Sequence, residues 1–155
     1  MKLYLIDDRG ETGEYADFLD AHRESLPGFE LEVFTHFAAL LEAVRREMPG
    51  AILADMRFDM IPAEELYGDI DALAGTEQFC GNRDRAEAQI RGMQGLLVCR
   101  ALRERDVRVP VILFASLAPG VAANVMRQLA PIRIIEGLIL SDVRDALREI
   151  VVSGS

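Results

Sequence analysis

Short apolar runs recur along the chain, separated by stretches in which apolar residues repeat every three or four positions. The first run, at residues 1–6, stops abruptly at the adjacent carboxylates of Asp7 and Asp8. Runs of this length, bounded by charge, are typical of parallel strands that helices cover on both faces. The second run, at residues 29–34, alternates apolar and acidic residues, which predicts a half-exposed strand. We expect five strands, at residues 1–6, 29–34, 51–56, 109–116 and 132–135.

The intervening stretches have the spacing of amphipathic helices. A first helix is expected over residues 12–22, and a later one over residues 93–105. Thr35 and Ser141 are placed to cap two further helices, and Pro119 suits the first turn of another. The spacing predicts a buried stripe of Tyr15, Phe18 and Leu19 in the first helix and an inward stripe of Val143, Ala146, Leu147, Ile150 and Val151 in the last. In the other two helices, apolar residues repeat at helical spacing or line one face: Phe37, Leu40, Leu41 and Val44, and Val121, Val125 and Leu129.

Strand and helix therefore alternate five times. This order predicts an α/β fold, a doubly wound parallel sheet with right-handed crossovers and helices on both faces. The chain has 155 residues, of which half are hydrophobic and 28% are charged, so its size and composition are those of a single globular domain.

One segment interrupts this alternation. Residues 57–92 are far longer than the ~2–6 residues that usually connect a strand to its helix. Residues 62–73 and 83–90 each have helical spacing. The apolar positions of the first of these two helices are Leu66, Ile70 and Leu73. Because the segment follows the strand that ends at Asp55, we expect it to lie beside or over that strand end, as a lid, an added interaction surface or a structural decoration.

The charge and the distribution of apolar residues exclude several classes of partner and targeting segment. The net charge is −9, and the 17 Lys and Arg residues are scattered among acids, so we expect no nucleic-acid partner. No apolar run approaches the ~20 residues that span a bilayer, so we expect no membrane association. Acids follow the first apolar run directly, which is not the pattern of a signal peptide.

Cysteine and histidine are too dispersed for a metal site. Cys80 and Cys99 form no CxxC pair, and His22 and His36 lie far from both in sequence. Two isolated cysteines fit a reducing compartment better than a disulfide framework, so we expect a cytoplasmic protein without zinc.

Carboxylates recur at the ends of predicted strands. Asp7 and Asp8 follow the first strand, and Asp55 lies at the end of the third. If these strands are neighbours, all three side chains meet at one edge of the sheet, where open α/β sheets place their chemistry. An aspartate that caps a helix explains one such position but not three. Clustered carboxylates favour a bound cation, and hard oxygen ligands of this kind suit Mg²⁺.

Four stretches of the sequence together resemble a response-regulator receiver domain. The resemblance rests on an acid pair after the first strand, a single acid at the end of the third, a glycine before the third helix, and Pro-Val at the fourth strand, in this order. The matching stretches are residues 3–8, 51–56, 92–105 and 107–114. Residues 59–91 lie outside the resemblance, and we expect them to be an insertion within one domain that spans residues 1–155.

The resemblance implies a flavodoxin-like sheet with the strand order 2-1-3-4-5. It also implies that Asp55 accepts a phosphoryl group from a histidine kinase or a phosphotransfer protein. Asp7 and Asp8 would hold Mg²⁺ together with Asp55 and the backbone carbonyl of Arg57. The residues suit this chemistry, since a carboxylate can act as an in-line nucleophile while a metal neutralises phosphoryl oxygens.

Several positions depart from the receiver pattern. The hydroxyl residue expected at the end of the fourth strand falls on Ala115, and Ser116 comes one residue later. Either a bulge shifts the strand or the switch hydroxyl is lost. The aromatic residue expected in the fifth strand is Arg133, and the lysine expected after it is Glu136. We therefore expect the usual switch to be compromised.

Glu136 is the departure with the largest electrostatic consequence. A carboxylate beside a phosphoryl group repels it unless another cation intervenes. Arg9, Arg57 and Arg133 are the candidate cations expected near the site. Alternatively, Glu136 pairs permanently with one of these arginines, or it points to solvent.

We expect an atypical receiver domain of two-component signalling, with Mg²⁺ as cofactor and a histidine kinase and a downstream protein as partners. It would be no enzyme beyond Mg²⁺-dependent self-phosphorylation and dephosphorylation, and it would be a stand-alone regulator or a fragment, compatible with a homodimer. The alternative is a pseudo-receiver that is never phosphorylated and acts through protein contacts, on the face formed by the fourth helix, fifth strand and fifth helix. A weaker alternative is a Mg²⁺-dependent phosphotransfer or hydrolase enzyme, which the fold alone would not establish.

Overall fold

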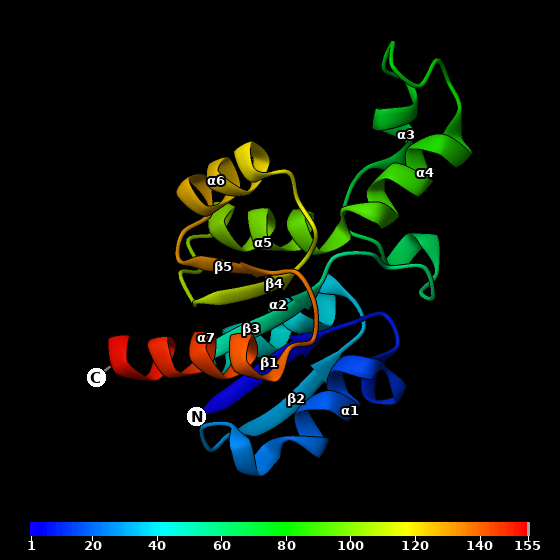
Figure 1. The fold of residues 1–155 in the computed structure, drawn as a ribbon. Coiled ribbons are helices and arrows are strands. Elements are labelled where there is room, and N and C mark those ends of the chain that lie inside the picture. Colours follow the sequence, from blue (N-terminus) through cyan, green and yellow to red (C-terminus); the bar gives the residue numbers. More distant parts are fainter. Residues whose placement is uncertain (155) are drawn as a thin grey trace.

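The computed structural model describes residues 1–154, which contain one five-stranded parallel sheet (Figure 1). The strands are β1 Lys2–Ile6, β2 Glu30–Phe34, β3 Ala51–Asp55, β4 Val111–Phe114 and β5 Ile132–Ile135. Their order is β2-β1-β3-β4-β5, so the expected α/β fold and strand order are confirmed. β4 is shorter at both ends than the apolar run at residues 109–116.

Helices cover both faces of the sheet (Figure 1). They are α1 Glu14–Ala21, α2 Phe37–Arg46, α5 Gln94–Glu104, α6 Pro119–Gln128 and α7 Leu140–Ser153, with the short 3₁₀ turns η1 Gly10–Thr12 and η2 Arg23–Ser25 on either side of α1. α1 and α7 pack on one face, and α2, α5 and α6 pack on the other. Within residues 1–154, no helix is both long and apolar enough to cross a membrane.

The central strands are apolar throughout because both of their faces are buried. In β1, Tyr4 and Ile6 belong to the core under α2 and α5, whereas Leu3 and Leu5 belong to the core under α1 and α7. Side chains alternate across a strand, so burial on both faces requires an unbroken apolar run. All four side chains are fully buried. β2 lies at the edge of the sheet and is only partly buried, which accounts for its alternating sequence.

Residues 59–91, called the arm below, begin at the end of β3 and then project away from the sheet (Figure 1). The arm contains the 3₁₀ turn η3 Ala63–Glu65, the short helix α3 Ile70–Ala74 and most of α4 Arg83–Gly92. The second predicted helix, at residues 83–90, is confirmed as α4. The first, at residues 62–73, is wrong, because its middle is extended rather than helical.

A buried glutamine explains why that helix does not form. The backbone N–H of Tyr67 donates to Oε1 of Gln94 at 2.6 Å, and Nε2 of Gln94 donates to the Tyr67 carbonyl at 3.0 Å. Gln94 is fully buried at the start of α5. The backbone of Tyr67 therefore pairs with a side chain distant in sequence instead of with the next helical turn. Asp69 then caps α3 by accepting a hydrogen bond from the N–H of Ala72.

Two predicted helix caps, and the inward position predicted for Val151, are also wrong. α2 begins after His36, whose backbone is extended, and the hydroxyl of Thr35 contacts the His36 ring instead. α7 begins at Leu140, so Ser141 lies inside its first turn. Val121 and Val151 are exposed, at 49% and 43%, because α6 and α7 turn these side chains away from the sheet. Pro119 lies in the first turn of α6, as expected.

Candidate functional site

The ends of β1 and β3 bring three carboxylates together. Ile6 pairs with Ala54 in register, so the residues that follow them, Asp7 and Asp55, emerge at the same level of the sheet. Ligand atoms of Asp7, Asp8 and Asp55 lie within 4.8 Å of one another. This is the arrangement that the sequence predicted for neighbouring strand ends.

Asp7 is buried and incompletely hydrogen-bonded. Its side chain is 2% exposed, Oδ1 accepts a hydrogen bond of 3.3 Å from the N–H of Arg9, and Oδ2 is buried without a partner. A Cβ atom on Gly13 would lie 2.3 Å from Oδ2, so any residue other than glycine at position 13 would displace this carboxylate. Burial, followed by the adjacent side chain of Asp8, raises the pKa of Asp7 from 3.8 to about 7. An oxygen buried without a donor is one that a cation would satisfy.

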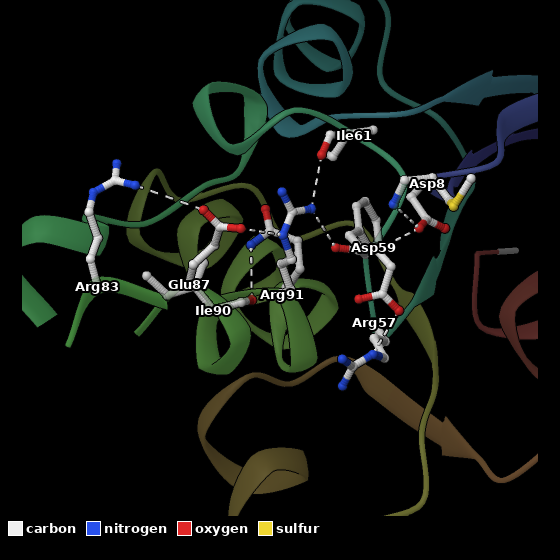
Figure 2. A network of polar contacts seen from close by, with 11 residues as sticks. Asp8, Arg57, Asp59, Ile61, Arg83, Glu87, Ile90 and Arg91 are labelled. Carbon is white, nitrogen blue, oxygen red and sulfur yellow. Dashed lines mark hydrogen bonds and ion pairs between the residues drawn. The ribbon is translucent and has the colours of Figure 1, made fainter. Parts of the chain in front are cut away.

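Asp8 connects the acidic cluster to the arm (Figure 2). Its Oδ2 accepts hydrogen bonds from two consecutive backbone N–H groups, of Asp59 at 2.6 Å and of Met60 at 2.9 Å. These bonds hold the Asp8 carboxylate in one orientation. The arm therefore begins by fixing a member of the acidic cluster.

Arg91 holds the loop that supplies these two N–H groups. Nη1 of Arg91 donates to the carbonyls of Phe58 at 3.1 Å and Ile61 at 2.9 Å, and the N–H of Phe58 donates to the Arg91 carbonyl at 2.9 Å. Nε of Arg91 pairs with Glu87 on the preceding turn of α4, and Phe58 is fully buried. Figure 2 shows this chain of contacts from Asp8 through the loop to α4. The loop geometry thus depends on a side chain more than thirty residues further along the chain.

Asp55 is held by one backbone donor and one side-chain donor. Its Oδ1 accepts hydrogen bonds from the hydroxyl of Tyr15 at 2.9 Å and from the N–H of Met56 at 2.8 Å. Burial raises the pKa of Asp55, and these two hydrogen bonds oppose the rise. Burial, and then the charge of Asp55, raises the pKa of Tyr15, so this phenol remains protonated and acts as a donor.

A glycine allows α5 to start against the end of β3. The N–H of Gly95 donates to the Met56 carbonyl at 2.9 Å, and a Cβ at Gly95 would lie only 2.0 Å from the carbonyl oxygen of Asp55. This close approach is the physical reason for a glycine at the start of this helix. It also fixes the backbone of the central aspartate.

The three carboxylates open into a cavity of about 360 Å³. The cavity is lined by Asp7, Asp8, Arg9, Glu14, Tyr15, Asp55, Arg57, Asp59 and Met60. Of the arm, only Asp59 and Met60 line it, so α3 and α4 are not a lid over this cavity. Arg9 and Arg57 both border the cavity, as expected. Nε of Arg57 forms an ion pair of 2.7 Å with Asp59.

The donor set fits a divalent cation of the Mg²⁺ type. Three carboxylates converge, and one of their oxygens is buried without a hydrogen-bond donor. Hard cations take oxygen ligands of this kind, and Mg²⁺ is usually held by one or two carboxylates with waters. Asp7, Asp8 and Asp55 would hold the ion, and Arg57, whose carbonyl the resemblance assigns as a further ligand, lines the same cavity.

The expected switch positions lie to one side of this cavity. β4 pairs with β3 and β5 in continuous register through Phe114, so no bulge shifts the strand, and Ala115 occupies the position expected for the hydroxyl. Ser116 donates from Oγ to Oε1 of Glu136 at 2.6 Å. Within residues 1–154, the Glu136 side chain is exposed and has this one hydrogen bond, so it does not form the permanent pair with an arginine that was one of the alternatives.

Arg133 lies further down β5, away from the acidic cluster. It pairs in register with Ile112, and its guanidinium forms an ion pair with Glu149 of α7. Arg133 does not line the cavity of the three carboxylates. The expectation that it supplies a nearby positive charge is therefore not met, whereas Arg9 and Arg57 remain at the cavity.

The sequence interpretation missed Tyr15 as a site residue. We expected this side chain only as part of the apolar stripe of α1, yet its hydroxyl contacts Asp55. A tyrosine carries a polar group that usually finds a partner when buried, so its place seven residues after the acid pair was an available indication. The backbone donors of Asp59 and Met60 left no such indication, because they act through the peptide and not the side chain.

The chain has the fold of response-regulator receiver domains. The receiver domain of the Francisella response regulator 1452 matches it with a TM-score of 0.65 at 12% identity, over 99% of this chain and 98% of that one. A response regulator receiver protein from Pseudoalteromonas atlantica matches with a TM-score of 0.61 at 13% identity, over the full length of both chains. The receiver domain of Nitrogen Regulatory Protein C matches with a TM-score of 0.61 at 15% identity, over 97% of this chain and 94% of that one. No protein-family model and no curated protein sequence matches the chain.

Proposed function

We propose that this chain of receiver fold is a phosphoryl-accepting domain in which Asp55 is the acceptor and Mg²⁺ the cofactor. The observation that carries the proposal is the convergence of Asp7, Asp8 and Asp55 within 4.8 Å at one edge of the sheet. A phosphoryl group is anionic, so these carboxylates would repel it without a cation. When bound, Mg²⁺ supplies that neutralisation and orients the phosphoryl oxygens.

The hydrogen bonds at the site support distinct roles for the three aspartates. Asp7 and Asp8 would hold the ion, since Asp7 has a partnerless oxygen and Asp8 is oriented by two backbone donors. Asp55 would be the nucleophile. Its Oδ1 accepts two hydrogen bonds, and within residues 1–154 no donor contacts Oδ2, so Oδ2 is the atom left to bond to phosphorus.

The partners that this function requires follow from its chemistry. The phosphodonor would be a phosphohistidine of a histidine kinase or of a phosphotransfer protein, and a downstream protein would read the phosphorylated state. The chain itself would catalyse only its own Mg²⁺-dependent phosphorylation and dephosphorylation.

A second candidate function is a pseudo-receiver that acts by protein contact without phosphorylation. The observation in its favour is the hydrogen bond of 2.6 Å between Ser116 and Glu136. This bond joins the loops that follow β4 and β5. Glu136 is negatively charged, whereas the receiver pattern has a lysine at this position. Its natural contact surface would be the face of α6, β5 and α7, where Val121 and Met126 of α6 are exposed.

Beryllofluoride, which mimics a bound phosphoryl group, separates the two candidates. Backbone NMR spectra are recorded with Mg²⁺ alone and then with beryllofluoride, for the wild type and for Asp55→Asn. We expect Mg²⁺ to shift resonances around Asp7 and Asp8, and beryllofluoride to add changes that Asp55→Asn abolishes. A Mg²⁺ response with no response to saturating beryllofluoride would support the pseudo-receiver. No response to either would refute the proposed phosphoryl-accepting site.

A further inference from the structure

The hydroxyl of Tyr15 donates a hydrogen bond to Asp55, the proposed phosphoryl acceptor. It lies 2.9 Å from Oδ1 of Asp55, and the ring packs against Phe114 at the end of β4, with 4.9 Å between ring centroids. Among residues 1–154, no other side chain donates a hydrogen bond to Asp55. A phenol used only to fill the core would not need to direct its hydroxyl at the most reactive group of the site.

The strength of this hydrogen bond changes when Asp55 is phosphorylated. In phosphorylation, Oδ2 of Asp55 forms a bond to the phosphorus of the donor. At the same time the bond from phosphorus to the leaving group breaks, and the leaving group departs with the electron pair. The carboxylate of Asp55 becomes the acyl group of an acyl phosphate, in which the negative charge lies on the phosphoryl oxygens and Oδ1 is an uncharged carbonyl oxygen. Hydrogen bonds to a charged acceptor are about twice as strong as those to a neutral one. The bond from Tyr15 therefore stabilises the unphosphorylated form more.

We propose that Tyr15 is a catalytic residue that restrains phosphorylation of Asp55 and promotes loss of the phosphoryl group. This inference rests on the proposed function of Asp55. In the forward direction, the hydroxyl stabilises the attacking carboxylate and makes it a weaker nucleophile. In hydrolysis, water attacks phosphorus, the bond to Oδ2 breaks with its electron pair remaining on Asp55, and inorganic phosphate departs with the oxygen and both protons of the water. The same hydroxyl then stabilises the charge that develops on the departing carboxylate.

Because Tyr15 lies on α1, its hydrogen bond to Asp55 depends on the position of this helix. Tyr15 is in the first turn of α1, two residues after the glycine that accommodates Asp7. Its ring is held by Phe114, two residues before Ser116. The donor to Asp55 is thus attached to α1 and β4 together, rather than to the loop that carries Glu136.

The test removes only the hydroxyl. Wild type, Tyr15→Phe and Tyr67→Phe are incubated with Mg²⁺ and acetyl phosphate, and intact mass gives the phosphorylated fraction and its decay after the donor is removed. Tyr67→Phe is the matched control, because it removes a phenol hydroxyl in the arm whose ring packs on Phe37. Tyr15→Phe keeps the ring on Phe114, and an unchanged melting temperature confirms that its fold is retained.

We expect Tyr15→Phe to raise the ratio of phosphorylated to unphosphorylated protein roughly tenfold, the effect of the difference between a hydrogen bond to a charged and to an uncharged acceptor, and to lengthen the lifetime of the acyl phosphate. Tyr67→Phe should match the wild type. A ratio that is unchanged or lower in Tyr15→Phe, with a phosphorylated wild type, would overturn this inference alone. Absence of phosphorylation in the wild type and in Tyr15→Phe would overturn the proposed function as well, whereas phosphorylation in Tyr15→Phe only would support both.

Discussion

The hydroxyl of Ser116 donates a hydrogen bond of 2.6 Å to Oε1 of Glu136, and this bond links the loop after β4 to the loop after β5. Both side chains are exposed. In the receiver pattern a hydroxyl and a lysine are expected to respond to the phosphoryl group, at the positions of Ala115 and Glu136, so Ser116 lies one residue after the expected hydroxyl. Here Ser116 and Glu136 bond directly to each other, so two side chains of the chain itself connect the two loops.

The charge of Glu136 should lower the reactivity of the acidic edge. Glu136→Lys reverses a negative charge near an anionic reaction, so we expect phosphorylation by acetyl phosphate to become severalfold faster, with a smaller gain for Glu136→Gln. Intact mass over time measures the rate. Glu30→Lys is the control, because it makes the same change of net charge at the start of the edge strand β2. An equal gain in Glu30→Lys would mean that net charge, and not the position of Glu136, sets the rate.

The buried carboxyl of Asp7 should make the stability of the metal-free protein depend on pH. Burial, and then Asp8, raises its pKa from 3.8 to about 7, so between these values the folded protein keeps a proton that the unfolded chain has released. Stability therefore falls as the pH rises through this window. Relative to Asp7→Asn, we expect the wild type to lose on the order of 2 kcal/mol of unfolding free energy between about pH 4 and about pH 8.

Urea denaturation in the presence of EDTA measures this difference. Asp17→Asn, which changes an exposed acid of α1, should follow the wild-type curve at every pH. Parallel curves for the wild type and Asp7→Asn would show that Asp7 is not protonated in the folded protein. Saturating Mg²⁺ should remove the loss at high pH, since the ion binds the deprotonated carboxylates.

Arg91 should affect the metal site although it does not touch it. Arg91→Gln removes the guanidinium from the carbonyls of Phe58 and Ile61, so we expect a loss of about 1–3 kcal/mol of stability and a severalfold weaker affinity for Mg²⁺. The affinity falls because the N–H groups that orient Asp8 lie in the loop that Arg91 holds. Isothermal titration calorimetry measures the affinity, and urea denaturation measures the stability.

Arg83→Gln is the matched control for this prediction. Arg83 lies on the same helix and pairs with Asp71 and Glu87, but its side chain is 57% exposed. Exposed ion pairs contribute little to stability, so both quantities should remain close to those of the wild type. If Arg91→Gln lost stability but kept its full affinity for Mg²⁺, the arm would be structural only.

The sheet and the acidic cluster could be predicted because their determinants are local or periodic. Residues 132–135 form β5 with the predicted bounds. Asp7 follows β1 and Asp55 ends β3, two strands whose apolar sequences indicate burial on both faces. Once neighbouring parallel strands are assumed, residues at matching ends must meet. No further information was needed to place the two carboxylates together.

The arm and the donor to Asp55 could not be predicted because they depend on distant contacts. Helical spacing over residues 62–73 is outweighed by the buried side chain of Gln94, 27 residues after Tyr67. The spacing of α1 correctly predicted that Tyr15 faces the sheet. It could not indicate that the hydroxyl reaches a residue 40 positions later, since that distance depends on the register of β1 and β3.

The central claim is that Asp55 accepts a phosphoryl group, and chemical trapping tests it most directly. The protein is treated with Mg²⁺ and acetyl phosphate and then with borohydride, which reduces an aspartyl phosphate to homoserine, and peptides are sequenced by mass spectrometry. We predict homoserine at position 55, dependent on Mg²⁺ and absent from Asp55→Asn. Recovery of unmodified Asp55 from donor-treated wild type and Tyr15→Phe, or homoserine at Asp7 or Asp8 instead, would contradict the account.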